Sequence, residues 1–183
     1  MKTRRKDIQK AAYDLVGTQG LESLHARTVA AELGINHATV HYYFPRRVDL
    51  LIGVVDFLEE QLQFDRTRFQ EGLSSAGDQL EAELALAEAY CKKSSRFAKV
   101  LAGLYVAGVA DPVVKKRLNG IWKLWAGEFS RLIPEAKVKK TSPYVDADLL
   151  AGTLFGFMLA SHLTDGQFDA KSKIDDVFIS MFG

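Results

Sequence analysis

The chain has 183 residues, of which 48% are hydrophobic and 26% are charged, and its formal net charge is +1 at pH 7. These proportions are typical of a soluble globular protein, and a single cysteine excludes an intramolecular disulfide and fits a reducing cytoplasm. The longest uncharged apolar stretch, residues 149–163, is shorter than the roughly 20 residues that a membrane-spanning helix needs, so we expect no membrane anchor.

The charge is unevenly distributed along the chain. Residues 1–50 contain eight Lys and Arg against five acids, whereas residues 51–100 contain six against nine. A local concentration of basic side chains governs attraction to phosphates more than the net charge does. The first quarter of the chain is therefore the part expected to contact nucleic acid.

Residues 8–16 have apolar side chains at helical spacing, which predicts an amphipathic first helix that ends at Gly20. Its first turn carries Arg4 and Arg5, although cations are unfavourable at the positive end of a helix dipole. A basic arm lying on a phosphate backbone explains this arrangement, and a fraying basic terminus is the alternative.

Residues 28–44 have the pattern of a helix-turn-helix. The first apolar helix is followed by Gly34, which tolerates a positive φ, then by Ile35 as a buried plug and by Asn36 as an N-cap. In the second helix, expected at 38–44, Val40 and Phe44 face inward. The outward side chains are aromatic, imidazole or hydroxyl groups without an acid: His37, Thr39, His41, Tyr42 and Tyr43. Such a face suits a groove lined by base edges and phosphates.

The segment from Ile8 to Leu51 resembles the DNA-binding domain of the TetR family of bacterial transcriptional regulators. The resemblance rests on Ala11-Ala12, Gly20, the run 29–35 (VAAELGI), the run 39–44 (TVHYYF) and Leu50-Leu51. The sequence departs from the family pattern at His41, where tyrosine is usual, and at His25, where a Thr or Ser cap is usual. The resemblance implies contacts with DNA phosphates and bases. Together with the basic first turn, it predicts the DNA-binding residues Arg4, Arg5, Arg27, Thr28, Asn36, His37, Thr39, His41, Tyr42, Tyr43, Arg46 and Arg47.

Two other chemistries were weighed against this one. His37 and His41 have the i, i+4 spacing of metal ligands, but Ala38 stands where a zinc protease has glutamate, and the helix offers no third ligand. Residues 72–76 (GLSSA) are a near miss to a nucleophile elbow, without the second glycine or a preceding strand. The sequence therefore predicts neither an enzyme nor a metal or cofactor site.

The remainder of the chain is expected to be all-α. Pro45 is followed by a long helix that links residues 1–46, the predicted helix-turn-helix DNA-binding domain, to residues 47–183, the predicted helical ligand-binding and dimerisation domain. After a loop, Asp78 is expected to cap a helix that ends near residue 94. A following helix should end at Gly108, and Asp111-Pro112 should start the next one.

The last helices are expected at 143–165, opened by Ser142-Pro143 and closed by Gly166, and at 171–182. Residues 134–143 are predicted to form an exposed loop. The small residues Gly152, Gly156 and Ala160 recur at i+4, which permits close approach of another helix, within the monomer or across a dimer. In the resembled family the last two helices pair across a two-fold axis, which implies a dimer interface that also includes Ile174 and Phe178.

Aromatic side chains are frequent on the inward stripes of this part. Most are ordinary core, but TetR-like proteins generally hold an inducer between these helices, and buried Tyr and Trp need partners for their polar atoms. The predicted ligand-binding residues are Tyr90, Cys91, Tyr105, Trp122, Trp125, Met158 and His162. Because this set has no obvious buried charge, we expect a small apolar or aromatic effector.

The sequence thus predicts a homodimeric, ligand-responsive transcriptional regulator that binds a palindromic operator in double-stranded DNA and is most simply a repressor. One alternative is a TetR-like DNA-binding protein without an inducer pocket. The other is an all-α enzyme or carrier whose helix-turn-helix is incidental.

Overall fold

The computed structural model describes residues 2–164 and 167–183, and this part of the chain is helical without a strand, which confirms the predicted all-α class. The chain divides into two compact units, the first made of Met1–Leu62 and Lys99–Gly120, the second of Gln63–Ala98 and Ile121–Gly183. Three helices, α4 (Arg47–Phe69), α6 (Arg96–Ala110) and α7 (Pro112–Leu132), contain residues of both units. No helix in the described part is long and apolar enough to span a bilayer.

The first unit begins with four helical segments: α1 (Lys2–Gln19), η1 (Leu21–Ser23), α2 (Ala26–Glu32) and α3 (His37–Tyr43). Gly20 ends α1 as predicted, with a φ of 83° that favours glycine. Helix α1 packs against α2, and its Tyr13 ring lies 5.0 Å from the ring of Phe57 on α4. The core of these segments consists of buried apolar side chains: Ile8, Ala12, Leu15, Val16, Leu24, Val29, Val40, Phe44, Leu50 and Val54.

The first part of α7 is held to α4 by ion pairs in the first unit. Arg117 donates from Nε to Asp56 Oδ1 at 2.7 Å and also pairs with Glu59. The prediction that Gly108 ends a helix is wrong, because α6 continues to Ala110. A Cβ at position 108 would lie 2.8 Å from Leu118 Cδ1, so this glycine allows α6 and α7 to pack closely.

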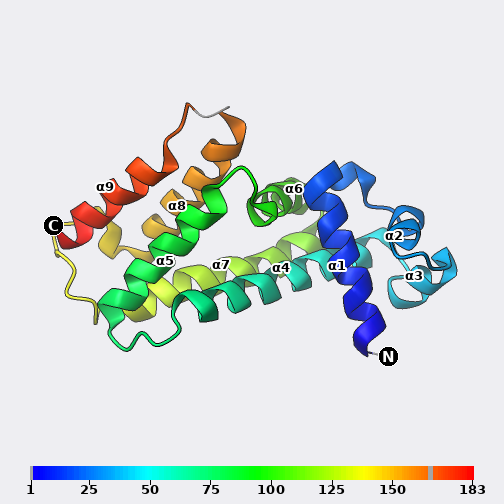
Figure 1. Cartoon of the computed structure of the whole chain (residues 1–183), viewed down its shortest axis with the longest axis horizontal. Coiled ribbons are helices and arrows are strands. Elements are labelled where there is room, and N and C mark those ends of the chain that lie inside the picture. Colours follow the sequence, from blue (N-terminus) through cyan, green and yellow to red (C-terminus); the bar gives the residue numbers. More distant parts are fainter. Residues whose placement is uncertain (1, 165–166) are drawn as a thin grey trace. The chain divides into compact units, whose positions relative to one another are not determined.

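The second unit contains the end of α4 together with α5 (Ala76–Cys91), η2 (Pro143–Val145), α8 (Ala147–Leu163) and α9 (Ala170–Phe182). Helix α5 packs against both α8 and α9, and these two also contact each other, as Figure 1 shows in green, gold and red. The buried side chains of this group include Leu84, Leu154 and Val177, one from each helix.

Two predicted helix starts are wrong in detail. The cap of α5 is Ser75, whose Oγ accepts from the Asp78 backbone N–H at 3.1 Å. Ser142 caps only the short segment η2, and α8 is capped by Asp146, whose Oδ1 accepts from Leu149 N–H at 2.8 Å. In both places a hydroxyl or carboxylate a few residues away was the better-placed acceptor. Helix α5 also ends at residue 91 rather than near 94.

The start of α7 is confirmed, because Asp111 Oδ1 accepts from the N–H groups of Val113 and Val114 at 2.8 and 3.3 Å. The predicted stop at Gly166 lies outside the described residues. Residues 134–143 form a mostly exposed loop, as predicted, and the Lys139 N–H donates to the Met181 carbonyl at 2.7 Å, which fixes this segment to the end of α9.

Candidate nucleic-acid interface

The connection between α2 and α3 has the backbone of a helix-turn-helix. Gly34 has a φ of 61°, the left-handed conformation that glycine adopts without strain. Asn36 Oδ1 accepts from the Ala38 N–H at 2.9 Å and caps α3, as predicted. The two residues therefore fix both the turn and the start of the second helix.

The inner face of this motif is closed by Val29 and Val40, which are fully buried. Ile35 is half-buried, so the prediction that it is the buried plug of the turn is wrong. Val29 and Val40 therefore form the buried part of this motif, and Ile35 lies at its edge.

The outer face of α3 carries the side chains that the sequence singled out. His37, His41 and Tyr42 are exposed, and Tyr42 is 71% accessible. Thr39 and Tyr43 are half-buried. Neighbouring rings contact each other edge to face, with centroids 6.1 Å apart for His37 and His41 and 5.1 Å apart for Tyr42 and Tyr43. These contacts order the face while its polar atoms stay accessible.

The basic residues of α1 are not equivalent. Arg5 donates from Nη1 to the Tyr43 carbonyl at 3.2 Å, and its guanidinium lies 4.5 Å from the centroid of the Phe44 ring. It therefore holds the C-terminal end of α3, where a cation complements the helix dipole. Arg4, in contrast, is exposed, and its ion pair with Asp7 is long, with 3.9 Å between the nearest atoms. Sequence reasoning placed both residues in a DNA-binding arm without separating these roles.

Arg46 at the start of α4 is engaged by Asp49. Its Nε and Nη2 donate to the two carboxylate oxygens at 3.0 and 2.7 Å, and its backbone N–H donates to the same group at 3.0 Å. These hydrogen bonds lower the pKa of the Asp49 carboxyl and raise that of the guanidinium. A phosphate at this position would compete with Asp49. Arg47 makes a long contact of 3.4 Å from Nη2 to the Leu21 carbonyl.

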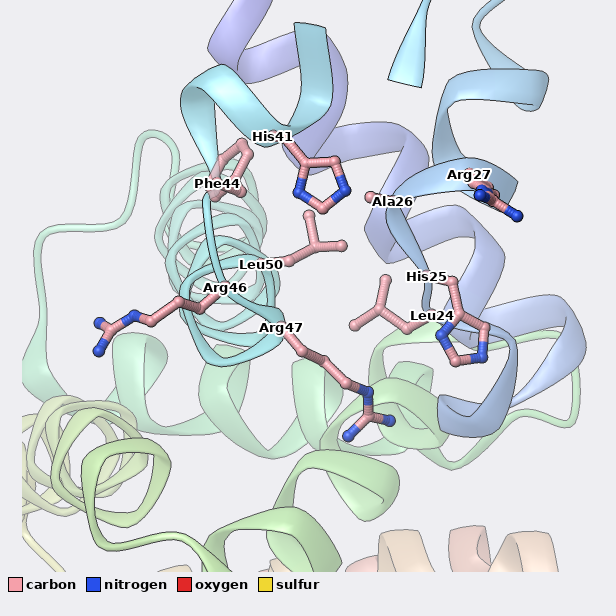
Figure 2. A pocket seen from close by; sticks show the side chains of 9 residues that line it. All are labelled: Leu24, His25, Ala26, Arg27, His41, Phe44, Arg46, Arg47 and Leu50. Atoms are coloured by element: carbon pink, nitrogen blue, oxygen red, sulfur yellow. The ribbon is translucent and has the colours of Figure 1, made fainter. Parts of the chain in front are cut away.

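A hollow of about 350 Å³ lies in the first unit, beside α3 and the start of α4. Figure 2 shows the Leu24 and Leu50 side chains between His41 and His25, while Arg46 points away from them. Arg27, Arg47, two imidazoles and an apolar floor make this hollow suited to an anionic group, whereas Arg46 is paired with Asp49. Its lining residues are Leu24, His25, Ala26, Arg27, His41, Phe44, Arg46, Arg47 and Leu50. Of the remaining predicted contacts, Arg27 is exposed and Thr28 is half-buried.

Sequence reasoning missed Gly53 on α4. A Cβ there would lie 2.6 Å from Phe44 Cε1, so only glycine lets the buried Phe44 ring pack against α4. Phe44 directly follows α3, and Gly53 therefore helps to set the position of that helix. A glycine inside a long apolar helix was the available signal.

Among the predicted ligand-binding residues, Tyr90, Cys91, Trp125 and Met158 are buried in the second unit. The Tyr90 hydroxyl donates to Asp65 Oδ2 at 3.0 Å. Trp122 is half-buried and donates from Nε1 to Asp148 Oδ1 at 3.2 Å. His162 also belongs to this unit, whereas Tyr105 lies in the first unit. Burial raises the pKa of the Tyr105 hydroxyl.

The predicted interface residues differ in their surroundings. A Cβ at Gly152 would lie 3.8 Å from Trp122 Cη2, so this glycine faces α7 of its own chain. Gly156 is exposed, and a Cβ added there would meet no neighbouring side chain or helix of the described residues within 4 Å. Ala160 is half-buried, and Ile174 is buried. Phe178 is half-buried and lies 5.0 Å from the Phe182 ring.

A buried polar network in the second unit was not predicted. Arg66 on α4 donates to both oxygens of Glu83 on α5, at 2.6 and 2.9 Å, and to the Leu124 carbonyl of α7 at 3.3 Å. Gln70 bridges Glu83 and Glu128. Burial raises the pKa of the Glu83 carboxyl, although Arg66 opposes this shift. The position of this acid on the otherwise apolar inward stripe of α5 was the signal that could have revealed it.

Among the residues that the structure describes, no group of three or more His, Cys, Asp or Glu side chains is arranged to hold a metal ion. The His37–His41 pair thus has no third protein ligand in the described part of the chain. The chemistry on α3 is that of hydrogen bonding and aromatic contact.

A family model described as bacterial regulatory proteins of the TetR family matches residues 8–54. These residues comprise most of α1, the α2–α3 motif and the first turns of α4, which include Gly53. Residues 8–54 therefore form a DNA-binding domain of the TetR family. The family comparison points to a DNA-binding regulator and away from an enzyme.

Similarity to known proteins extends beyond the matched segment. The nucleoid occlusion factor SlmA of Photobacterium profundum is 22% identical over 158 residues, which cover 85% of this chain and 80% of that protein. A protein described as a transcriptional regulator from Saccharomonospora viridis, solved in complex with choline, has a TM-score of 0.80 at 17% identity and covers 98% of this chain and 95% of its own. A TetR-family member from Streptomyces coelicolor A3 has a TM-score of 0.69 at 23% identity, over 97% and 98% of the two chains. The structural likeness shows that the fold is shared.

Proposed function

We propose that the protein is a dimeric transcriptional regulator that binds a palindromic operator and is released from it by a small molecule. The observation that carries this proposal is the exposed outer face of α3, with His37, His41 and Tyr42 accessible beside the basic hollow, in a domain that belongs to the TetR family. A DNA-binding regulator acts in the cytoplasm, and a single buried cysteine is compatible with that compartment.

The contacts to DNA divide into two kinds. We assign Tyr42, Arg27 and Arg47 to phosphate contacts, with one phosphate in the hollow. His37 and Thr39, on α3, are the candidates for base edges in the major groove. We assign Arg5 to positioning α3 through the Tyr43 carbonyl, and Asn36 to capping it.

The effector is proposed to bind in the second unit, among Tyr90, Trp125 and their neighbours. Two observations support this. These side chains form an aromatic cluster, with the rings of Tyr90 and Phe97 stacked 3.9 Å apart, and the similar protein from S. viridis was solved with choline bound. An effector lowers DNA affinity if it binds the conformation that is incompatible with DNA more tightly than the DNA-binding conformation. The size of the effect is set by the difference between these two effector affinities.

The dimer is proposed to form through the outer faces of α8 and α9. On α8 the exposed residues Leu149, Gly156 and Leu163 recur every seven positions and so share one face. On α9 Ile179 is 61% accessible. Gly156 suits this contact better than Gly152, which faces Trp122. A two-fold dimer would give a palindromic operator its matching symmetry.

Salt-dependent DNA binding tests the proposal. Fluorescence anisotropy with a labelled duplex should show a DNA affinity that falls steeply as the salt concentration rises. The reason is that Lys and Arg side chains release condensed counterions when they bind phosphates, and added salt opposes this release. Arg47→Ala should reduce the slope of log affinity against log salt by about one ion. Lys173→Ala, on α9, is the matched control and should leave the slope unchanged. Absence of binding even at low salt would reject the proposal.

A second candidate is a TetR-family DNA-binding protein without an effector. The similarity to proteins named nucleoid occlusion factors favours it, because that name describes no small-molecule control. The two candidates differ in one measurement. A screen of small molecules by thermal unfolding should find stabilising compounds that also weaken DNA binding if the first candidate is correct.

A further inference from the structure

Two buried polar atoms of the second unit stand out. Among the residues that the structure describes, neither Trp125 Nε1 nor His162 Nε2 has a hydrogen-bond partner. The Trp125 side chain is only 3% exposed. Buried polar atoms in native proteins are nearly always hydrogen-bonded, so such atoms indicate a place where a bound water or ligand supplies the partner.

The two atoms have opposite hydrogen-bonding character. The indole Nε1–H of Trp125 is a donor only. His162 Nδ1 lies 2.9 Å from the Met158 carbonyl, which can only accept, so Nδ1 carries the proton. In the neutral imidazole Nε2 is then an acceptor. The Trp125 Nε1–H is therefore left without an acceptor, and His162 Nε2 is left without a donor.

Contacts place both atoms near the end of α5. The rings of Trp125 on α7 and Tyr90 on α5 meet edge to face with centroids 6.4 Å apart. The next residue, Cys91, has Ser161 on α8 as a neighbour that lowers the pKa of its thiol, and Ser161 Oγ lies 3.1 Å from His162 Nδ1. Helices α5, α7 and α8 therefore converge here, and the stacked Tyr90 and Phe97 rings supply an apolar neighbour.

We propose that Trp125 and His162 form the polar end of the effector site, and that the effector is an uncharged molecule whose hydroxyl group accepts from Trp125 and donates to His162. This inference rests on the proposed function, and it replaces a purely apolar effector with one that carries a specific polar group. A carboxylate could accept from Trp125 but would face the lone pair of His162 and the nearby Asp65. An ammonium group would offer Trp125 no acceptor.

The test uses four matched probes: benzyl alcohol, toluene, benzoate and benzylamine. Binding to the full-length protein is measured by isothermal titration calorimetry. Benzyl alcohol should bind about tenfold more tightly than toluene, since each net hydrogen bond contributes a modest amount. Trp125→Phe and, separately, His162→Phe should abolish this preference. The proposal leaves Trp122, one of the residues that the sequence predicted for the ligand site, outside the polar end of that site, because its indole already donates to Asp148. Trp122→Phe is therefore the matched control and should keep the preference.

Equal affinity for benzyl alcohol and toluene in the wild-type protein would overturn the proposal, as would tighter binding of benzoate or benzylamine, or no saturable binding of any probe. A water held permanently between Trp125 and His162 would give equal affinities for the two probes, because it would already satisfy both polar atoms. Thermal unfolding of each variant supplies the folding control. A cooperative transition shows that a lost alcohol preference comes from the missing polar atom and not from an unfolded protein.

DNA binding separates this inference from the proposed function. If benzyl alcohol binds through Trp125 and His162 but leaves operator affinity unchanged, the site stands and the effector role fails. If the alcohol preference is absent while specific DNA binding is intact, the regulator proposal stands and this site is wrong.

Discussion

At the scale of single residues, the position of α3 depends on the contact between Phe44 and Gly53. A methyl group added at Gly53 would lie 2.6 Å from Phe44 Cε1, so the ring must move. We expect Gly53→Ala to lower the free energy of unfolding by about 1–3 kcal/mol, the usual cost of overpacking a core. Urea unfolding measures this.

Gly127→Ala on α7 is the matched control, because nothing lies within 4 Å of the added methyl group. It should stabilise the protein by about 0.5–1 kcal/mol, the ordinary gain for alanine over glycine in a helix. If the two substitutions had the same effect, the packing role of Gly53 would be wrong.

Cys91 provides another prediction at this scale. It is 6% exposed, and burial raises the pKa of its thiol to about 11. Because the thiolate is the reactive form, the folded protein should react very slowly with iodoacetamide at neutral pH. Unfolding in guanidinium chloride should release one rapidly reacting thiol per chain. Rapid labelling of the folded protein would contradict the described packing of α5 against α8.

At the scale of elements, α3 is proposed to separate base contacts from phosphate contacts. Thr39→Ala should cost about 1–3 kcal/mol at particular base pairs only, because a direct base contact discriminates between sequences. Tyr42→Phe should instead weaken binding to operator and random DNA alike. Anisotropy titrations with both duplexes measure the difference. Equal losses on the two duplexes for both variants would remove this division of roles.

The network around Glu83 joins α4, α5 and α7 in the second unit. Glu83→Gln would leave Arg66, whose side chain is 12% exposed, without its carboxylate, and breaking such a buried pair should destabilise by about 3 kcal/mol. Urea unfolding provides the measurement, and Glu60→Gln, in an exposed pair with Lys6, should change the stability little. A neutral effect of Glu83→Gln would show that the pair is not a stabilising link.

The elements also show how far the sequence could be interpreted. The helix-turn-helix was predictable because Gly34 and Asn36 act through their own backbone, at fixed distances along the chain. The pairing of Arg66 with Glu83 and the contact of Gly53 with Phe44 depend on which helix faces which, and one-dimensional spacing does not define that. The same limit explains why Gly108 was misassigned as a helix end, when it serves the packing of Leu118.

At the scale of the whole molecule, the proposed dimer predicts that apolar residues on the outer faces of α8 and α9 are covered by a second copy. Leu163 is 78% exposed in the single chain. Sedimentation velocity should show a dimer at micromolar concentration, and Leu163→Asp should shift it towards monomer. Val109→Asp, at an 88% exposed position on α6, should leave the dimer intact. A wild-type monomer at this concentration would end the dimer proposal.

The central claim is that the outer face of α3 reads a DNA sequence. The most direct measurement is to select fragments from a random double-stranded DNA pool with the purified protein and to sequence those retained. We predict enrichment of one palindromic sequence, lost for Thr39→Ala combined with His37→Ala while weak, salt-sensitive binding to random DNA persists. Recovery of the pool without sequence enrichment, or enrichment unchanged in the double variant, would contradict the account.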